Sequence, residues 1–268
     1  MKPFFFIDYD NTIFSHRTWA VPDSALEALS HLKELGCRVV LASGRPFRYT
    51  SLPEEFQGRF LPDCLVSSNG AIIETPEEVL WEKYFDPELQ TRLLDYVVEK
   101  KYCLMSSADG KWCTSNLERF LELASPRQRK LLPESGEAFQ KIYHCQMTSF
   151  FLADTEEAIA DVQAHFPELK LLYMGPELGG ADIIPAENGK VIGASRILSH
   201  YGLTWEHTVA IGDSMNDIDL IRKASYGIAM GNAMKEVQEA ADYVTTDIDA
   251  DGLARAIAHV LKLDGLLA

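Results

Sequence analysis

An apolar run that ends in carboxylates constrains the fold of this chain more than any other feature of its sequence. The run Phe4–Ile7 is followed directly by Asp8 and, two residues later, by Asp10. A run of this kind is typical of a buried strand in a parallel sheet, and α/β proteins place their ligands at the carboxyl edge of such a sheet. If the strand continued past Asp8, both carboxylates would point into the same crevice.

Two interpretations of this acidic pair are open from the residues alone. Two like charges in one crevice need a counter-ion, and a hard divalent cation with oxygen ligands, most often Mg²⁺, would serve. One carboxylate could then act as a nucleophile while the other handles protons. The alternative is a strand end followed by an Asx-turn and a helix cap, because Asp10, Asn11 and Thr12 also suit a turn. Taken alone, the pair favours neither.

Composition limits the class of protein. The 268 residues are 47% hydrophobic, which is ordinary for an α/β core with a second, smaller domain. The net charge of −15 argues against a nucleic-acid partner. The five cysteines include no Cys-x-x-Cys pair, which argues against a disulfide framework and a thiolate zinc site. Without a signal-peptide pattern or a window of about 18 apolar residues, we expect a cytoplasmic protein with no membrane partner.

The first 81 residues alternate strands and helices. Val21–Ser24 opens a helix that Gly36 closes, and Cys37–Ala42 is the next strand. A right-handed βαβ unit brings the ends of both strands to one edge of the sheet, which places Ser43-Gly44-Arg45 near Asp8. A short strand over Cys64–Val66 and a hairpin at Asn69-Gly70 end this block.

The regular alternation of strands and helices is interrupted between residues 82 and 185 and resumes after it. We interpret 82–185 as an inserted α/β domain, and 1–81 with 186–268 as one doubly wound parallel sheet. The elements expected in the insertion are a helix over 86–101, a hairpin turning at Asp109-Gly110, a helical stretch over 116–131, a strand over Tyr143–Leu152, a helix near 155–165 and strands near 169–174 and 181–184. After it we expect helices near 188–201, 216–223, 234–241 and 251–263 and strands over Thr208–Ile211, Tyr226–Met230 and Asp242–Thr245.

A second carboxylate cluster, Gly212-Asp213-Ser214-Met215-Asn216-Asp217, follows the strand at 208–211. An apolar strand again delivers an acid to the crevice, so Asp213 is the best additional metal ligand. Asn216 and Asp217 should lie in the first turn of the next helix, where Asn216 can donate to a bound oxyanion and Asp217 can hold a metal-bound water or orient a lysine. Alternatively, Ser214 is an N-cap and Asp217 its partner acid, and the two interpretations are compatible.

Two further segments suggest that a phosphate group binds. Ser43 and Gly44 offer a hydroxyl and backbone N–H groups at a strand-to-helix turn, the usual way of cradling an anion. Lys190 stands at the expected start of a helix, where a lysine is unfavourable for the helix dipole. A cation in that place indicates another role.

Four separated segments, in order, make the chain resemble a haloacid dehalogenase superfamily phosphatase of the Cof type with an α/β cap. Asp8-Tyr9-Asp10-Asn11-Thr12 matches the first motif, Asp-x-Asp-Gly-Thr, and Leu41–Pro46 matches the second. Lys190 matches the lone lysine of the third motif, and residues 212–217 give the fourth in full. The usual glycine is replaced by Asn11, the non-glycine residue that best tolerates a left-handed backbone.

The resemblance implies hydrolysis of a small phosphomonoester, a sugar phosphate or a phosphorylated cofactor, through an aspartyl-phosphate. Asp8 would be the nucleophile, and Asp10 the general acid and then the base. Mg²⁺ would be held by Asp8, the Asp10 backbone carbonyl and Asp213, with Asp217 as a further acid. The residues that would bind the phosphoryl oxygens are Ser43, Gly44, Lys190 and Asn216.

The insertion would be the cap that selects the substrate, and a monomer or weak homodimer is expected. The aromatic residues of the insertion and the seven histidines, His16 included, receive no role. A phosphomutase of the same superfamily, a receiver-type signalling module and a catalytically silent phosphate-binding protein are the alternatives. The insertion argues against the receiver, and the complete set of acids argues against a silent protein.

Overall fold

The computed structural model describes residues 2–108, 111–124, 129, 132–175 and 179–263. The chain divides into two compact units. The core unit comprises Met1–Glu82 and Asn188–Ala268, and the inserted unit comprises Lys83–Glu187. Each unit has its own sheet and its own apolar core.

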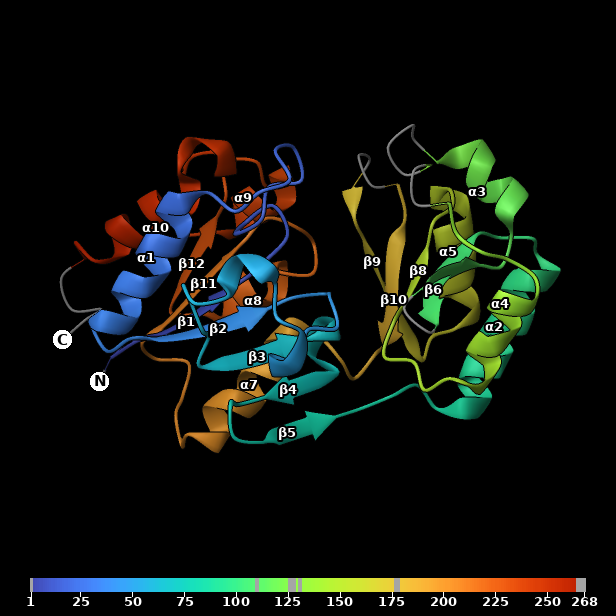
Figure 1. Ribbon diagram of the computed structural model, residues 1–268, viewed down its shortest axis with the longest axis horizontal. Helices are drawn as coiled ribbons and strands as arrows, with labels where there is room; N and C mark the ends of the chain where they lie inside the picture. Colours follow the sequence, from blue (N-terminus) through green and yellow to red (C-terminus); the bar gives the residue numbers. More distant parts are fainter. Residues whose placement is uncertain (1, 109–110, 125–128, 130–131, 176–178, 264–268) are drawn as a thin grey trace. The chain divides into compact units, whose positions relative to one another are not determined.

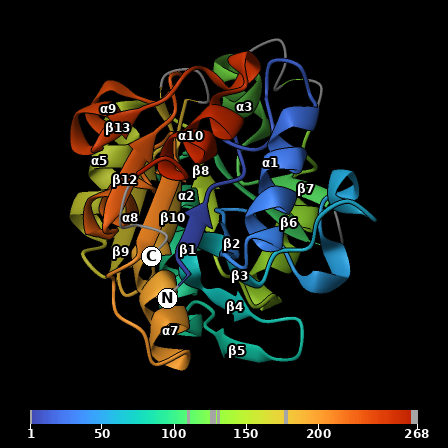
Figure 2. The ribbon, with the colours of Figure 1, turned by 90° about the vertical axis from the view of Figure 1, so that its left-hand side faces the viewer.

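The core unit contains an eight-stranded sheet in the order β13-β12-β11-β1-β2-β3-β4-β5 (Figure 1, with β13 labelled in Figure 2). The pairs from β13 to β3 are parallel, whereas β4 and β5 add an antiparallel edge. Phe5, Phe6 and Ile7 of β1 are fully buried, as expected for a central parallel strand covered on both faces. The strands are β1 Phe4–Ile7, β2 Arg38–Ala42, β3 Cys64–Ser67, β4 Ile72–Glu74, β5 Val79–Glu82, β11 Thr208–Gly212, β12 Tyr226–Ala229 and β13 Tyr243–Val244.

Helices cover both faces of this sheet, and α1 and α8 lie on opposite sides of β1 (Figure 2). The helix α1 buries Leu26, Leu29 and Leu32 along one stripe and ends before Gly36, whose φ of 78° fits the left-handed position after a helix. The helices are α1 Asp23–Glu34, α7 Lys190–His200, α8 Ile218–Lys223, α9 Lys235–Ala240 and α10 Gly252–Val260, with 3₁₀ turns at Tyr49–Ser51, Glu54–Phe56, Ser68–Gly70 and Ile248–Ala250.

The inserted unit contains a five-stranded sheet in the order β7-β6-β8-β10-β9, and its strand pairs are antiparallel. Asp86 caps α2 by accepting from the N–H groups of Glu88 and Leu89. The elements are α2 Pro87–Glu99, β6 Leu104–Ala108, β7 Lys111–Thr114, α3 Leu117–Leu123, α4 Glu137–Gln140, a 3₁₀ turn Lys141–His144, β8 Phe150–Leu152, α5 Glu156–His165, β9 Leu169–Tyr173 and β10 Ala181–Pro185.

The predicted fold class, a doubly wound parallel α/β sheet with a smaller α/β insertion, is confirmed. The predicted strand over Tyr143–Leu152 is wrong in its first part, where the structure has the 3₁₀ turn, and the strand is limited to Phe150–Leu152. The physical reason is a side chain of α2, because Gln90 Nε2 donates to the carbonyls of Ile142 and Cys145. These two carbonyls accept from a side chain and therefore do not pair with a neighbouring strand.

The predicted helix over 116–131 is also too long. The helix α3 ends at Leu123, and Ala124 is already extended. Pro126 follows shortly in the sequence and disfavours helical backbone before it. Residues 125–128 and 130–131 of that prediction, and the predicted turn at Asp109-Gly110, lie outside the described residues.

Candidate active site

The carboxyl edge of the core sheet collects the acids of two motifs. The strand β1 pairs in parallel with β11, with Ile7 opposite Ile211, so Asp8 and Asp213 leave neighbouring strands at the same edge. The Asp8 N–H donates to the Ile211 carbonyl at 3.0 Å, which fixes the backbone where the acid leaves the strand. The topology therefore places side chains from distant parts of the chain together.

Three buried carboxylates meet there. Asp8, Asp213 and Asp217 each contribute an oxygen to a group whose atoms all lie within 4.8 Å of one another. Lys190, at the first residue of α7, donates from Nζ to Asp8 Oδ1 at 2.5 Å and to Asp217 Oδ1 at 2.7 Å. The lysine side chain is only 1% exposed. One ammonium thus faces three carboxylates away from water.

This imbalance of charge shifts the protonation of the acids. Burial and the nearby charge of Asp217 raise the pKa of Asp8 to about 7, against the lowering effect of Lys190. Burial and the charge of Asp8 raise the pKa of Asp213 well above its ordinary value. Although burial opposes its charge, the carboxylates of Asp217 and Asp8 raise the pKa of Lys190. A buried set of carboxylate oxygens with excess negative charge fits a hard divalent cation such as Mg²⁺.

The loop after β11 holds Asp217 by its own backbone. Asp217 Oδ2 accepts from the N–H groups of Asp213 and Ser214, each at 3.1 Å. Gly212 is required beside it, because a Cβ there would lie 2.4 Å from Asp217 Cγ. The prediction that Asn216 and Asp217 lie in the first helical turn is wrong, since α8 begins at Ile218. The backbone hydrogen bonds to Asp217 keep the preceding residues in a turn.

Asp10 faces different partners from Asp8. The strand β1 ends at Ile7, so the two carboxylates are not aligned by a continuing strand, and Asp10 does not belong to the group of three acids. Its carboxylate accepts from Arg45 Nη2 at 2.5 Å and Nε at 3.0 Å, and lies 2.5 Å from His16 Nε2. Burial opposes ionisation of Asp10, but the hydrogen bonds from His16 and Arg45 outweigh it and lower the pKa.

The turn after Asp10 is built by residues of the first motif. The prediction of a left-handed backbone at Asn11 is confirmed by its φ of 53°. Thr12 Oγ1 donates to Asp213 Oδ1 at 3.4 Å and so links the first motif to the fourth. Sequence reasoning left Thr12 without a role, although it stood in the motif.

His16 and Arg45 were also missed as partners of Asp10. Arg45 stood next to Ser43 and Gly44 in a segment already singled out. His16 had no comparable signal, because its contact depends on the path of the chain after the left-handed turn. The sequence alone gives His16 no role.

The predicted phosphate-binding residues at this edge differ in burial and in their hydrogen-bond partners. Ser43 is buried, and its Oγ accepts from the N–H of Arg45 at 3.1 Å, whereas Gly44 is half-buried. Asn216 is buried and donates to Asn69 Oδ1 at 3.0 Å. The amide of Asn216 is therefore engaged with the loop after β3.

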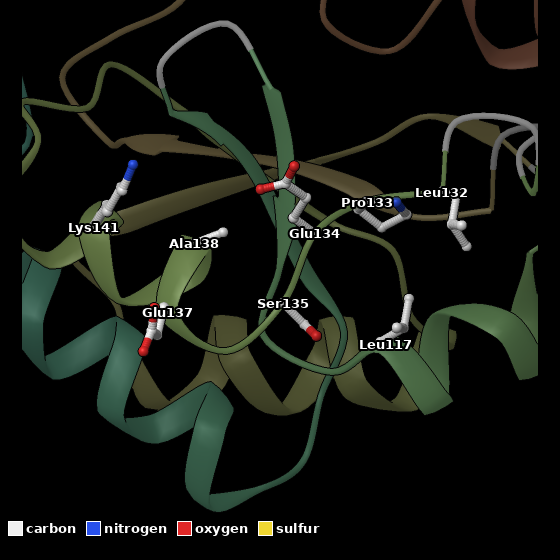
Figure 3. Close-up of a pocket in the computed structure, with 8 residues that line it drawn as sticks. All are labelled: Leu117, Leu132, Pro133, Glu134, Ser135, Glu137, Ala138 and Lys141. Atoms are coloured by element: carbon white, nitrogen blue, oxygen red, sulfur yellow. The ribbon is translucent and has the colours of Figure 1, made fainter.

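A separate hollow of about 530 Å³ lies within the inserted unit. Figure 3 shows Leu117, Pro133, Ser135 and Lys141 among the residues that line it. Neither the acids nor Lys190 contributes to this hollow.

No helix in the described part of the chain has the length and apolar character needed to cross a bilayer.

Comparison with known proteins agrees with this fold. The family of haloacid dehalogenase-like hydrolases matches residues 5–257, and the chain belongs to this family. With that fold and membership, the chain is an enzyme, a phosphoric monoester hydrolase of the haloacid dehalogenase type. The resemblance found in the motifs is thereby confirmed.

Relatives match almost the whole chain. YkrA of Bacillus subtilis (strain 168) is 29% identical over 264 residues, which cover 95% of this chain and 96% of YkrA. The 5-amino-6-(5-phospho-D-ribitylamino)uracil phosphatase YitU of the same organism is 23% identical, with 98% of this chain and 99% of YitU covered. Among solved structures, the sugar phosphatase BT4131, of HAD subclass IIB, has a TM-score of 0.82 at 28% identity and covers 96% of this chain and 98% of its own.

Proposed function

We propose that the chain is a Mg²⁺-dependent phosphatase that hydrolyses a small phosphomonoester through an aspartyl-phosphate on Asp8. The observation that carries this proposal is the meeting of Asp8, Asp213 and Asp217 within 4.8 Å around the buried Lys190. A salt bridge serving stability alone would need one acid for this lysine. Two further acids in a dry site are costly without a cation.

The reaction has two halves. In the first, an oxygen of Asp8 forms a bond to phosphorus while the bond from phosphorus to the ester oxygen breaks, and the leaving alkoxide takes a proton from Asp10. In the second, a water oxygen attacks the phosphorus of the aspartyl-phosphate, Asp10 takes the proton of that water, and the Asp8 carboxylate leaves. Asp10 returns to its protonated form and inorganic phosphate is released.

The contacts of Asp10 set the conditions for its two roles. With Arg45 and His16 donating to it, Asp10 is held as a carboxylate, the form that the second half requires. The first half requires the protonated acid, which the negative charge of a phosphoester bound beside it favours. Arg45 and His16 therefore keep the carboxyl group of Asp10 in the same orientation while it changes from acid to base.

The cation would be held by the side chains of Asp8 and Asp213 and by the Asp10 carbonyl, with Asp217 as a further acid. Bound there, Mg²⁺ would offset the negative charge of the nucleophile and of the phosphoryl group. The phosphoryl oxygens would be bound by Ser43, the backbone N–H of Gly44, Lys190 and Asn216.

Substrate selection is assigned to the inserted unit acting as a cap, with domain limits of 1–81, 82–185 and 186–268. A cap excludes water during phosphoryl transfer and contacts the leaving group. Sugar phosphates and phosphorylated cofactors are the proposed classes. The names of BT4131, a sugar phosphatase, and YitU, a phosphatase of a phosphoribityl compound, support this range.

The test is inorganic phosphate release from sugar phosphates, nucleotides, flavin mononucleotide, pyridoxal phosphate and p-nitrophenyl phosphate, with Mg²⁺ and with chelator. Wild type and Asp8→Asn are compared at equal concentration. We expect Mg²⁺-dependent release that Asp8→Asn abolishes. Substantial metal-dependent release by Asp8→Asn would contradict the role of Asp8, and no release from any compound would shift the assignment to a mutase or a binding protein.

A further inference from the structure

We infer that the loop 15–20 of the core unit forms a leaving-group site, in which the indole of Trp19 packs against a ring of the substrate. This inference rests on the proposed function, because it assigns the loop to the group released when Asp8 is phosphorylated. It narrows the substrate to phosphomonoesters of ring-bearing alcohols. The ring is a sugar or a planar heterocycle, since both present a flat face.

The loop is built as a rigid support. Ser15 N–H donates to the Ala20 carbonyl at 2.9 Å, and Trp19 N–H donates back to the Ser15 carbonyl at 2.8 Å. The buried Ser15 hydroxyl accepts from the N–H groups of Arg17 and Thr18, each at 3.3 Å. Arg17 in turn forms ion pairs with Asp247 and Asp249. The loop is thus tied both to itself and to the segment before α10.

Trp19 has a costly conformation and little burial to offset it. Its φ is 54°, in the left-handed region that costs a non-glycine residue roughly 1–2 kcal/mol. The side chain is nevertheless 61% exposed, the highest exposure among the large hydrophobic residues of the described chain. Residues held in the left-handed region cluster at active sites and ligand clamps, so this conformation, on a residue that stays exposed, points to a binding role.

A single imidazole connects Trp19 to the proposed general acid. The rings of His16 and Trp19 lie nearly parallel, with centroids 5.8 Å apart and an interplanar angle of 14°. The same His16 places Nε2 2.5 Å from Asp10 Oδ1. Phe14 packs against both rings in edge-to-face geometry, with its ring centroid 5.6 Å from each. The indole is therefore held at a fixed place one side chain away from Asp10.

This placement determines what the indole can contact. The ester oxygen of the substrate must reach Asp10 to receive its proton. The carbon skeleton attached to that oxygen therefore lies beside Asp10, among the side chains around this carboxyl group. The exposed indole is a large apolar surface there, and ring faces pack on indole with a preference beyond area alone. An acyclic leaving group has no ring face, so contact with the indole adds little to its binding affinity.

The experiment compares wild type, Trp19→Ala and Trp19→Phe on three substrates. Glucose 6-phosphate carries a sugar ring, p-nitrophenyl phosphate a planar ring, and glycerol 1-phosphate no ring. Trp81→Ala is the matched control, because Trp81 is a partly exposed tryptophan of the same unit on the outer strand β5, stacked on Arg196. KM and kcat are measured separately.

We expect Trp19→Ala to raise KM for a ring-bearing substrate by about tenfold with kcat nearly unchanged. Trp19→Phe should keep most of the affinity, and KM for glycerol 1-phosphate should stay within about twofold. A larger effect on glucose 6-phosphate identifies the sugar ring, and a larger effect on p-nitrophenyl phosphate identifies the planar ring. Unchanged KM for both ring substrates, or an equal rise for glycerol 1-phosphate, would overturn the inference, the latter indicating that Trp19 contacts protein instead.

A binding measurement separates this inference from the proposed function. Glucose 6-phosphate and, separately, pyridoxal phosphate are titrated into Asp8→Asn and into Asp8→Asn with Trp19→Ala, with tryptophan fluorescence and calorimetry as readouts. Binding that weakens and loses its fluorescence change without Trp19 supports the site even if no phosphate is released by wild type. Binding of both ligands that is unaffected by Trp19→Ala counts against it.

Discussion

The ammonium of Lys190 lies 2.5 Å from a carboxylate oxygen of Asp8, and both side chains are almost completely buried. The two residues are 182 positions apart in the sequence, so only the completed sheet and the start of α7 bring them together. Lys190 favours the ionised form of Asp8, which is the nucleophilic form. The same contact makes the activity of the site dependent on the position of α7.

Replacing Lys190 should therefore slow the reaction sharply. We expect Lys190→Ala to lose about 2 to 4 kcal/mol of transition-state stabilisation, the size typical of one preorganised charge-stabilising donor. The measurement is kcat/KM for phosphate release. Lys235→Ala is the control, since Lys235 is a lysine of α9 whose side chain is 85% exposed. An unchanged rate in Lys190→Ala would remove this lysine from the site.

The stability of the metal-free protein should fall as pH rises. The pKa of Asp8 is raised from 3.8 to about 7, mainly by burial, so the folded chain binds a proton that the unfolded chain releases. That contribution is complete below pH 3.8 and is lost as pH rises through about 7. In chelator, we expect Tm to decrease between pH 5 and pH 8, and Mg²⁺ to restore it at pH 8 more than at pH 5.

Asp213→Asn tests the origin of this dependence. The substitution removes one of the three buried charges, so both the decrease in chelator and the gain with Mg²⁺ should become smaller. Tm is measured by calorimetry for both proteins across the same pH series. A wild-type Tm that rises between pH 5 and pH 8 in chelator, or an equal Mg²⁺ effect in Asp213→Asn, would contradict the assignment.

Replacing Asp10 should affect the two halves of the reaction differently, depending on the leaving group. A p-nitrophenolate leaves without a proton, whereas an alkoxide needs one, so Asp10→Asn should slow phosphorylation of Asp8 by alkyl esters much more. With p-nitrophenyl phosphate we expect a burst of about one equivalent of p-nitrophenol and then turnover slower by roughly 10²–10⁴. Rapid-quench measurements detect the burst. Equal losses on both substrates without a burst would count against the double role of Asp10.

Much of the site's geometry follows from strand ends that can be read in the sequence. Apolar runs before Asp8 and Asp213 predict two strands of one parallel sheet, and parallel strands deliver the residues that follow them to one edge. That rule predicts that the two acids lie at one edge, and the structure adds that their strands, β1 and β11, are neighbours. Lys190 is indicated by its sequence position, because a lysine is unfavourable at a helix start.

The rest depended on contacts that no local pattern encodes. The partners of Asp10 are set by the left-handed turn at Asn11, which brings His16 back to a carboxylate six positions earlier. In the inserted unit, Gln90 binds carbonyls 52 and 55 residues away and replaces part of an expected strand by a turn. Side chains that capture distant backbone groups override strand propensity in this way.

The contact between Gly70 and Gly189 should be essential to both stability and activity. A Cβ on Gly70 would lie 2.3 Å from the Gly189 carbonyl oxygen, and Gly189 directly precedes Lys190. Gly58 is a matched control, because its φ of 68° resembles the 84° of Gly70 but a Cβ there meets nothing within 4 Å. Gly58→Ala should therefore cost only about 1 kcal/mol in the free energy of unfolding, with full activity.

Gly70→Ala carries the same backbone cost and adds a clash with main-chain atoms that cannot rotate away. We expect a larger loss of stability than in Gly58→Ala and a fall in kcat of about tenfold or more, since small displacements of a positioned charge reduce the rate steeply. Urea unfolding and phosphate release are measured on both variants. If Gly70→Ala matched Gly58→Ala in both measurements, the close approach at Gly189 would not be what positions Lys190. If stability fell while kcat stayed at the wild-type value, the start of α7 would tolerate the shift, and the lysine would be held by its two carboxylates instead.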